Sequence, residues 1–363
     1  MARAAGIAPI ERPRRAAAAC LLAIVGLAQH GGMAVGAAAG TAAGTVVGTV
    51  VGAAAGTVVG TAVGTVVGAA PPIAPDPADA LSPILVEQAG PRFVAPTRRD
   101  SIGRIWAPVY IDGKGPFRLV LDTGATQSAL IATVVSILGL PLNQTPPVLL
   151  RGVTGVATVP TVPISDLSIG DLVVNGAVLP IVPDALGGAD GILGTAGLED
   201  KRIVIDFLHD RITITFSRGK YPHRGFETLH FLPNLATPII VDARVGGVRT
   251  KAIIDTGGQL TIANDALRDA LLRHRFWKHG APDQIMGATR AVQAGEIIAT
   301  PAIDFGAISI RDHYITYSNL MIFDHWHLLH QPAILIGMDA LGTLDQLIID
   351  YRTHEVQMRV RPG

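Results

Sequence analysis

The chain has 363 residues, and its 29 lysine and arginine side chains are balanced by 29 aspartate and glutamate side chains. A formal net charge of zero excludes a nucleic-acid-binding protein that relies on a strongly basic surface. A single cysteine, Cys20, excludes an internal disulfide framework and a zinc site built from cysteines.

Residues 1–28 are predicted to be a secretory signal peptide. Four arginines precede an apolar run from Ala16 to Ala28. That run is shorter than the roughly 20 residues that a membrane-spanning helix needs. We therefore expect export to the periplasm or the extracellular space.

Residues 29–97 form a low-complexity segment that ends in a proline-rich linker. Glycine recurs at every fourth position from Gly36 to Gly68, and no charged side chain lies within this repeat. Two interpretations remain open. The repeat is a flexible spacer, or residues 35–70 form a helix lined by glycine that associates with a membrane.

The remainder of the chain has the pattern of a mostly β protein. From about Ile102, short apolar runs alternate with Gly, Pro, Asn and Asp turn signals. Helices are expected at residues 129–138 and 264–275. Gly113-Lys114-Gly115 lies between two apolar runs and is predicted to be a hairpin turn.

This part of the chain contains the same set of motifs twice. Asp122-Thr123-Gly124 and Asp255-Thr256-Gly257 each follow an apolar run. Each is followed by a glycine-bearing segment, then by two apolar residues and a glycine, then by an apolar run that ends in Asp and an aromatic residue. These segments are Gly152–Gly155, Ile192–Gly194 and Asp206-Phe207 in the first copy, and Gly287–Thr289, Leu335–Gly337 and Asp350-Tyr351 in the second. One Asp-Thr-Gly alone is typical of a turn, but two matched sets indicate an internal duplication.

The two motif sets resemble a known family. LDTGATQSAL and IIDTGGQLTIAN resemble the two active-site loops of pepsin-type and retropepsin-type aspartic proteases. GILGTAGLEDKRIVIDF and ILIGMDALGTLDQLIIDY are similar to the glycine segment and closing hairpin of bacterial retropepsin-like proteins. The resemblance implies a mostly β fold of two pseudo-symmetric β-barrel lobes with a cleft between them. We expect the N-terminal lobe at residues 98–230 and the C-terminal lobe at residues 231–363.

The resemblance also implies an aspartic endopeptidase with one catalytic aspartate from each lobe, Asp122 and Asp255. Two carboxyl groups within hydrogen-bond reach do not readily hold two negative charges, so one takes a proton from water while the other polarises the peptide carbonyl. This chemistry needs no cofactor and no metal. Because one chain supplies both aspartates, we expect a monomer that binds an extended peptide or protein substrate in the cleft between the lobes, with no nucleic-acid partner.

The neighbours of each aspartate have expected supporting roles. By the same resemblance, Thr123 and Thr256 hydrogen-bond across to the opposing loop. Gly124 and Gly257 permit a tight turn and a close backbone approach. The candidate flap residues are Gly152, Gly155, Gly287 and Thr289.

Two positions depart from the pepsin pattern. Pepsin-like members often have Ser or Thr directly after Asp-Thr-Gly, whereas this chain has Ala125 and Gly258. Loss of a hydroxyl donor to the ionised carboxyl group raises its pKa, so we expect a mildly acidic pH optimum. The missing hydroxyls also leave a second interpretation open, a catalytically silent protein that keeps the fold to bind peptides or envelope components.

Two further groups of side chains are expected to be structural. Asp206 and Asp350 are predicted to lie at strand ends and not to take part in catalysis. His325, His327 and His330 are predicted to lie in a solvated loop, because no carboxylate pattern accompanies them to suggest a metal site.

Overall fold

The structure is a computed structural model, which describes residues 104–142, 144–169, 172–219, 224–232, 238–273 and 280–360, together with the backbone of four short strands nearer the N-terminus. The predicted signal peptide and low-complexity segment lie outside the described residues, apart from β1 (Ala18–Ala19), β2 (Ala23–Val25) and β3 (Arg92–Pro96). Strand β3 pairs with a later strand, so the sheet structure begins within the segment predicted as a linker.

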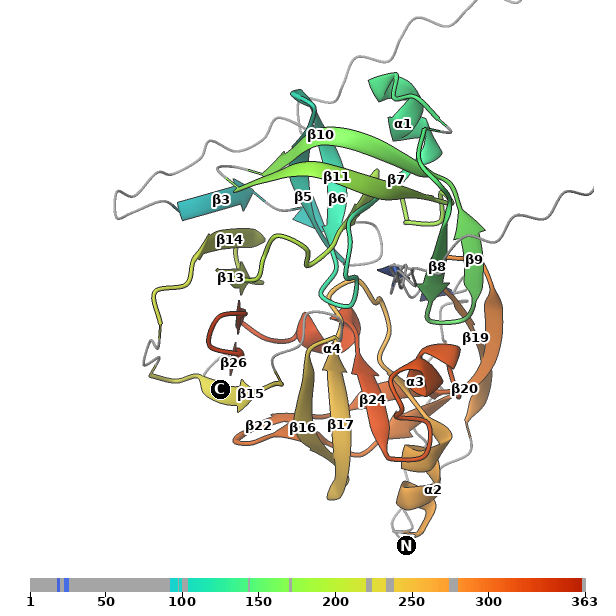
Figure 1. Cartoon of the computed structure of the whole chain (residues 1–363). Helices are drawn as coiled ribbons and strands as arrows, with labels where there is room; N and C mark the ends of the chain where they lie inside the picture. The colour runs from blue at the N-terminus through green and yellow to red at the C-terminus, as the bar shows by residue number, and fades with distance from the viewer. Residues whose placement is uncertain are drawn as a thin grey trace, which may run out of the picture. The chain divides into compact units, whose positions relative to one another are not determined.

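The described part of the chain is mostly β, as predicted, with 51% of its residues in strands and 11% in helices. Its N-terminal half contains a closed six-stranded barrel with the order β10-β11-β7-β12-β6-β5, closed by pairing of β10 with β5 (Figure 1). The strands are β5 (Ile105–Ile111), β6 (Lys114–Leu121), β7 (Ala129–Ile131), β10 (Thr161–Ile169), β11 (Leu172–Val182) and β12 (Gly191–Leu193), with the short β4 (Arg98–Arg99) beside β5. Along β5 every second residue, Ala107, Val109 and Ile111, is fully buried, which is the alternation that a strand with one face on the core requires.

The predicted hairpin turn joins β5 to β6. Asp112 and Gly113 form this turn with φ angles of 49° and 71°, the left-handed conformation that two-residue hairpin turns of type I′ require. The hairpin is therefore present, but its turn shares only Gly113 with the predicted one, because Lys114 and Gly115 already lie in β6.

The first predicted helix is wrong over its first three residues. Ala129–Ile131 form strand β7, and helix α1 runs from Ala132 to Leu138. Strand β7 is fully buried and pairs with both β11 and β12, so pairing with distant strands determines its conformation. The second predicted helix corresponds to α2 (Asp265–Arg273).

The C-terminal half forms a half-barrel, which is built on a ten-stranded sheet with the order β1-β19-β20-β23-β18-β24-β17-β16-β21-β22. Its strands are β16 (Ile240–Val245), β17 (Val248–Ile254), β18 (Ile262–Ala263), β19 (Ala281–Met286), β20 (Val292–Thr300), β21 (Ile303–Phe305), β22 (Ile308–Ile310), β23 (His313–Tyr317) and β24 (Ala333–Ile336). Helices α3 (Met321–His325) and α4 (Met338–Leu341) also belong to this half.

A third sheet takes strands from both halves, in the order β15-β26-β25-β13-β14-β3. Its remaining strands are β13 (Lys201–Asp206), β14 (Arg211–Phe216), β15 (Glu227–His230), β25 (Gln346–Asp350) and β26 (Glu355–Arg359). The middle strands, β13 and β25, run antiparallel, with Arg202 opposite Asp350. Backbone hydrogen bonds therefore join the two halves directly.

A separate three-stranded sheet consists of β2, β8 (Val148–Gly152) and β9 (Val156–Val159). The strands β8 and β9 form a hairpin with Val148 opposite Val159. This hairpin reaches across to the C-terminal half, as described below.

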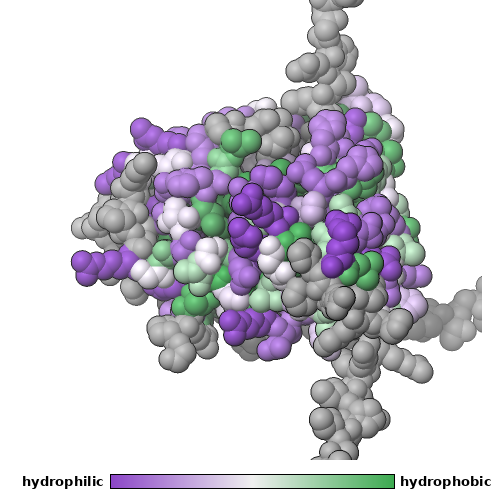
Figure 2. Space-filling model, turned by 90° about the horizontal axis from the view of Figure 1, so that it is seen from below, coloured by the Kyte–Doolittle hydropathy of each residue, from purple (hydrophilic) through white to green (hydrophobic). Residues whose placement is uncertain are grey.

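Buried apolar side chains of both halves form one continuous cluster, which extends from Leu119 in the barrel to Ile349 in the shared sheet. Figure 2 shows one face of the molecule, on which hydrophilic residues are interspersed with small apolar areas. None of the helices in the described part of the chain combines the length and hydropathy needed to cross a membrane.

Candidate active site

Asp122 directly follows β6, and its side chain is fully buried. Its backbone N–H donates a hydrogen bond to the carbonyl oxygen of Leu193 in β12, which runs parallel to β6. The carboxylate Oδ1 accepts hydrogen bonds from the backbone N–H groups of Gly124 at 2.8 Å and Ala125 at 3.0 Å. The loop therefore holds this oxygen in a fixed position.

Asp255 has the same surroundings in the C-terminal half. It directly follows β17, is fully buried, and donates its backbone N–H to the carbonyl oxygen of Ile336 in the parallel strand β24. Its Oδ1 accepts hydrogen bonds from the N–H groups of Gly257 at 3.0 Å and Gly258 at 2.9 Å. The two Asp-Thr-Gly motifs therefore form the same turn in each half.

Two glycines allow the chain to pass closely behind these loops. A Cβ at Gly194 would lie 2.4 Å from the carbonyl carbon of Gln127, and a Cβ at Gly337 would lie 2.5 Å from that of Leu260. Neither position can hold a larger residue without movement of the backbone. This explains the apolar-apolar-glycine segment that follows each Asp-Thr-Gly motif in the sequence.

The two threonines of the motifs connect the two loops. The backbone N–H of Thr123 donates to Oγ1 of Thr256, and the N–H of Thr256 donates to Oγ1 of Thr123, each at 3.1 Å. The Thr123 hydroxyl donates to the carbonyl oxygen of Ile254, and the Thr256 hydroxyl to that of Leu121, each at 2.7 Å. All four bonds are buried, and they bring the two aspartates together.

Burial and mutual repulsion change the acidity of both aspartates. Burial and the negative charge of Asp255 raise the pKa of Asp122 well above its ordinary value, although the backbone hydrogen bonds of the loop and the charge of Arg104 oppose this. Burial raises the pKa of Asp255 to about 7, against the backbone hydrogen bonds of its own loop, a hydrogen bond from the Asp122 side chain and the charge of Arg104. The two carboxyl groups therefore titrate as a coupled pair.

Arg104 is a member of this site that the sequence analysis did not identify. It immediately precedes β5, has no solvent exposure, and donates a hydrogen bond from Nη2 to the carbonyl oxygen of Leu186. Strands β5 and β6 pair with Trp106 opposite Val120. Arg104 precedes these paired residues, and its positive charge lowers the pKa of both aspartates.

The four candidate flap residues lie at the tips of two hairpins. Gly152 and Gly155 lie at the β8–β9 tip, and Gly287 and Thr289 at the β19–β20 tip. A Cβ at Gly152 would lie 3.3 Å from Cγ2 of Thr289. The structure therefore brings together the tips of hairpins from opposite halves.

The two tips are connected through Thr154, which the sequence analysis did not identify. Its hydroxyl donates to the carbonyl oxygen of Ala291 at 2.7 Å and accepts from the N–H of Gly287 at 3.1 Å. A Cβ at Gly287 would lie 2.6 Å from this hydroxyl oxygen. Glycine at this position therefore permits the close contact.

Asp206 and Asp350 do not belong to the pair. They end strands β13 and β25, and each Oδ1 accepts hydrogen bonds from the backbone N–H groups two and three residues further on, all at 3.1 Å. This confirms the prediction that both aspartates are strand-end residues.

The histidine-rich segment follows β23 and lies around helix α3. The predicted solvated loop is wrong for His325, which is the last residue of that helix, whereas His327 and His330 lie exposed in the turns after it. Within the described ranges, no group of three or more His, Cys, Asp or Glu side chains is arranged to hold a metal ion.

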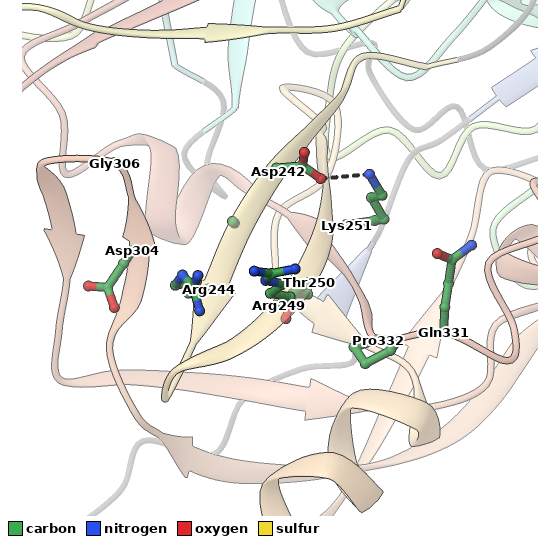
Figure 3. Close-up of a pocket in the computed structure, with 10 residues that line it drawn as sticks. Asp242, Arg244, Arg249, Thr250, Lys251, Asp304, Gly306, Gln331 and Pro332 are labelled. Atoms are coloured by element: carbon green, nitrogen blue, oxygen red, sulfur yellow. Dashed lines mark hydrogen bonds and ion pairs between the residues drawn. The ribbon is translucent and has the colours of Figure 1, made fainter.

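A surface cavity of about 620 Å³ lies over the β16–β17 hairpin of the C-terminal half (Figure 3). Its lining is largely charged, with Arg244, Arg249 and Asp304 near the ion pair between Lys251 Nζ and Asp242 Oδ1 at 2.6 Å. Among the described residues that line this cavity, none belongs to an Asp-Thr-Gly loop. The cavity is therefore distinct from the aspartate pair.

The closed barrel and the half-barrel have the form of retropepsin-like lobes, which defines the chain as having an aspartic-protease-like fold. A protein-family comparison agrees with this class. The family model described as aspartyl protease matches residues 107–196, the part of the barrel that contains Asp122. No curated protein matches the sequence.

Proposed function

We propose that this protein is an aspartic endopeptidase that hydrolyses peptide bonds with water activated between Asp122 and Asp255. The observation that carries the proposal is the pair of fully buried aspartates, held in matching loops by hydrogen bonds between Thr123 and Thr256. Two buried carboxyl groups with raised pKa values suit general acid and base catalysis near neutral pH.

The two aspartates have different roles in this mechanism. Ionised Asp255 accepts a proton from water while the water oxygen bonds to the peptide carbonyl carbon, and protonated Asp122 donates its proton to the carbonyl oxygen. The tetrahedral intermediate then loses its C–N bond. The proton on Asp255 passes to the leaving nitrogen, and Asp122 regains a proton from a hydroxyl of the intermediate. One water is consumed, and the pair returns to its starting state.

We propose that the substrate is an extended peptide that binds as an added strand between the β8–β9 and β19–β20 hairpins. Support comes from the edges of β8 and β19, each of which pairs with a short strand from residues 1–28, the predicted signal peptide, and so can accept an added strand. Strand β2 pairs antiparallel with β8, and β1 pairs parallel with β19. The proposal also includes an exported protein that needs no cofactor. It is proposed to act as a monomer, because one chain supplies both aspartates.

The proposal is tested by incubating the full-length protein with a peptide library between about pH 3 and about pH 8. Wild type, Asp122→Asn and Asp255→Asn are compared, each with and without a statine-type inhibitor whose hydroxyl mimics the tetrahedral intermediate. We expect cleavage by wild type alone, and we expect the inhibitor to abolish it. A folded wild-type protein that cleaves no peptide would instead favour a catalytically silent peptide-binding protein.

A further inference from the structure

The first turn of α4 is hydrogen-bonded to the Asp255 loop. The backbone N–H of Met338 donates to the carbonyl oxygen of Gly258 at 2.8 Å, and that of Asp339 donates to the carbonyl oxygen of Gln259 at 3.1 Å. Gly258 in turn donates its own N–H to Oδ1 of Asp255 at 2.9 Å. The position of this catalytic carboxyl group therefore depends on how α4 and the loop are held together.

The side chain of Asp339 makes a second connection between α4 and the end of this loop, through Thr261. Thr261 is fully buried, and it donates its hydroxyl to Oδ1 of Asp339 at 2.7 Å and its backbone N–H to Oδ2 at 3.1 Å. Its hydroxyl oxygen also accepts from the N–H of Gly337 at 3.1 Å. Hydrogen bonds to a carboxylate are stronger than those between neutral groups, so one side chain satisfies both donors of a buried residue.

A third element, strand β23, lies against the same carboxylate. Nε2 of His313 is 3.2 Å from Oδ2 of Asp339, and the two side chains are 12% and 23% exposed. On the same strand, Thr316 donates its backbone N–H to the carbonyl oxygen of Thr261 at 3.2 Å. Strand β23 therefore contacts both the carboxylate and the residue that donates to it.

The N-terminal half lacks this second connection. The N–H of Gly194 donates to Oγ of Ser128 at 3.1 Å, so Ser128 corresponds to Thr261. Ala196 corresponds to Asp339, because its N–H also donates to a carbonyl oxygen of the loop in its own half, at 3.1 Å. Alanine has no carboxylate that could accept from Ser128. The additional connection is thus made only to the loop that carries the proposed base.

We propose that Asp339 is a positioning residue for Asp255, because its carboxylate joins Thr261 to α4 and so holds the Asp255 loop in its catalytic geometry. This inference rests on the proposed function, in which Asp255 accepts the proton of water. Without the carboxylate, both donors of Thr261 lose these acceptors, and the loop keeps only its backbone bonds to α4. A small displacement of a catalytic group slows the chemical step strongly even where it changes substrate binding little.

The kinetic test compares kcat and KM of wild type, Asp339→Ala, Asp339→Asn and the control Asp304→Ala. Asp304 is half-buried like Asp339, but it lines the surface cavity of the same half (Figure 3). We expect Asp339→Ala to lower kcat by about tenfold and to leave KM within about twofold of wild type. Asp339→Asn keeps one oxygen that accepts from the Thr261 hydroxyl, so its kcat should lie between those of wild type and Asp339→Ala.

The control Asp304→Ala should leave both constants unchanged. An increase in KM for Asp339→Ala with an unchanged kcat would overturn the proposal, because Asp339 would then act on substrate binding and not on the base.

Backbone hydrogen exchange tests the same role without the need for catalytic activity. Exchange is measured for residues 122–128 and 255–261 in the same variants. We expect Asp339→Ala to speed exchange at residues 255–261 by at least about threefold and to leave residues 122–128 unchanged, because only one loop loses a connection. Faster exchange by the same factor in both loops would indicate a general loss of stability, and unchanged exchange would show that the connection is not needed. Either result would overturn the proposal.

The exchange measurement also separates this inference from the proposed function. If wild type cleaves no peptide, faster exchange confined to residues 255–261 in Asp339→Ala still supports the role of Asp339 in holding the loop and rejects only the peptidase. If Asp339→Ala does not fold, Asp339→Asn decides the question, since it removes one of the two acceptors of Thr261. Faster exchange at residues 255–261 alone then supports the proposal, and exchange equal to that of wild type contradicts it.

Discussion

Thr123 and Thr256 exchange hydrogen bonds in both directions. Each backbone N–H donates to the hydroxyl of the other at 3.1 Å, and each hydroxyl donates at 2.7 Å to a carbonyl in the opposite half. Because each threonine directly follows its aspartate, the relative position of the two carboxyl groups depends on this exchange. The geometry of the site is therefore a property of both loops together.

Replacement of Thr256 by valine is expected to reduce both stability and activity. The variant Thr256→Val leaves the buried N–H of Thr123 and the buried carbonyl of Leu121 without these partners, at roughly 1–3 kcal/mol for each unsatisfied group. Chemical denaturation and kcat/KM check the expectation. Thr256→Ser, which keeps the hydroxyl, is the matched control. If valine and serine had equal effects, the hydroxyl would not be what joins the loops.

The stability of the aspartate pair should depend on pH in a defined direction. The pKa of both aspartates is raised in the folded protein. Their favourable contribution is therefore complete at low pH and is lost as the pH rises through the folded pKa. We expect Asp255→Asn to gain stability relative to wild type between about pH 5 and about pH 8. Thermal unfolding measures this, with the exposed Asp269→Asn as control. A gain equal in both variants would argue against the burial effect.

The rate of peptide cleavage is expected to fall as the pH is lowered through the pKa of Asp255, about 7, because the base must be ionised. A second fall is expected at higher pH, when Asp122 loses its proton. This optimum lies closer to neutrality than the mildly acidic one expected from the sequence alone. A pH–rate profile measured with a single cleaved peptide tests it, and a maximum below about pH 3 would contradict it.

Contact between the two hairpin tips should matter for turnover. Thr154→Val removes the hydroxyl that bonds to Ala291 and Gly287. Two hydrogen bonds of roughly 0.5–1.5 kcal/mol each would then be missing from the closed hairpins. We expect kcat/KM to fall by about tenfold and Tm to fall by a few degrees. The exposed Thr158→Val on the same hairpin is the control. Unchanged kinetics for Thr154→Val would show that the tips need not stay connected.

The shared sheet offers a matched pair of acidic residues for a stability test. Asp350 is 1% exposed, lies 3.5 Å from Arg202 Nη1 and accepts a hydrogen bond from the Ser217 hydroxyl at 2.8 Å. Asp206 occupies the equivalent strand end, where its partner His209 is exposed. Asp350→Ala removes the buried carboxylate that lies beside the Arg202 guanidinium and accepts from the Ser217 hydroxyl, and is expected to lower the free energy of unfolding by roughly 3–5 kcal/mol. Asp206→Ala should cost about 1 kcal/mol. Equal losses in chemical denaturation would contradict this reasoning.

The pair of aspartates could be predicted because its signal is local. An apolar strand followed by Asp-Thr-Gly can be recognised without knowledge of the rest of the fold. The motif occurs twice, so Asp122 and Asp255 could be matched by comparing the two copies. Ala129–Ile131 could not be assigned correctly, because they form a strand only through pairing with β11 and β12. Those partners lie far away in the sequence, beyond the reach of a local pattern.

The place of Arg104 could not be predicted for a different reason. At the hairpin, Ile111 pairs with Lys114. If this register continued without interruption along β5, Arg104 would lie opposite Leu121. A β-bulge near Tyr110 shifts the register by one residue, which moves every later side chain to a new partner. After the shift Trp106 lies opposite Val120, so Arg104 and Asp122 are each two residues beyond this pair. A bulge has no reliable signature in a single sequence, so the position of Arg104 near the aspartates could not be predicted.

The pairing of β13 with β25 has a consequence for how the protein is made. Hydrogen-bonded partners in this sheet, such as Arg202 and Asp350, are separated by 148 residues. Contacts over such distances form slowly, because a long loop must close before they are gained. During synthesis the sheet that joins the two halves stays incomplete until the segment containing β25 has emerged. A nascent chain that already contains both Asp-Thr-Gly loops therefore still lacks the central strand pair that joins them, and peptide cleavage should begin only after β25 has been added.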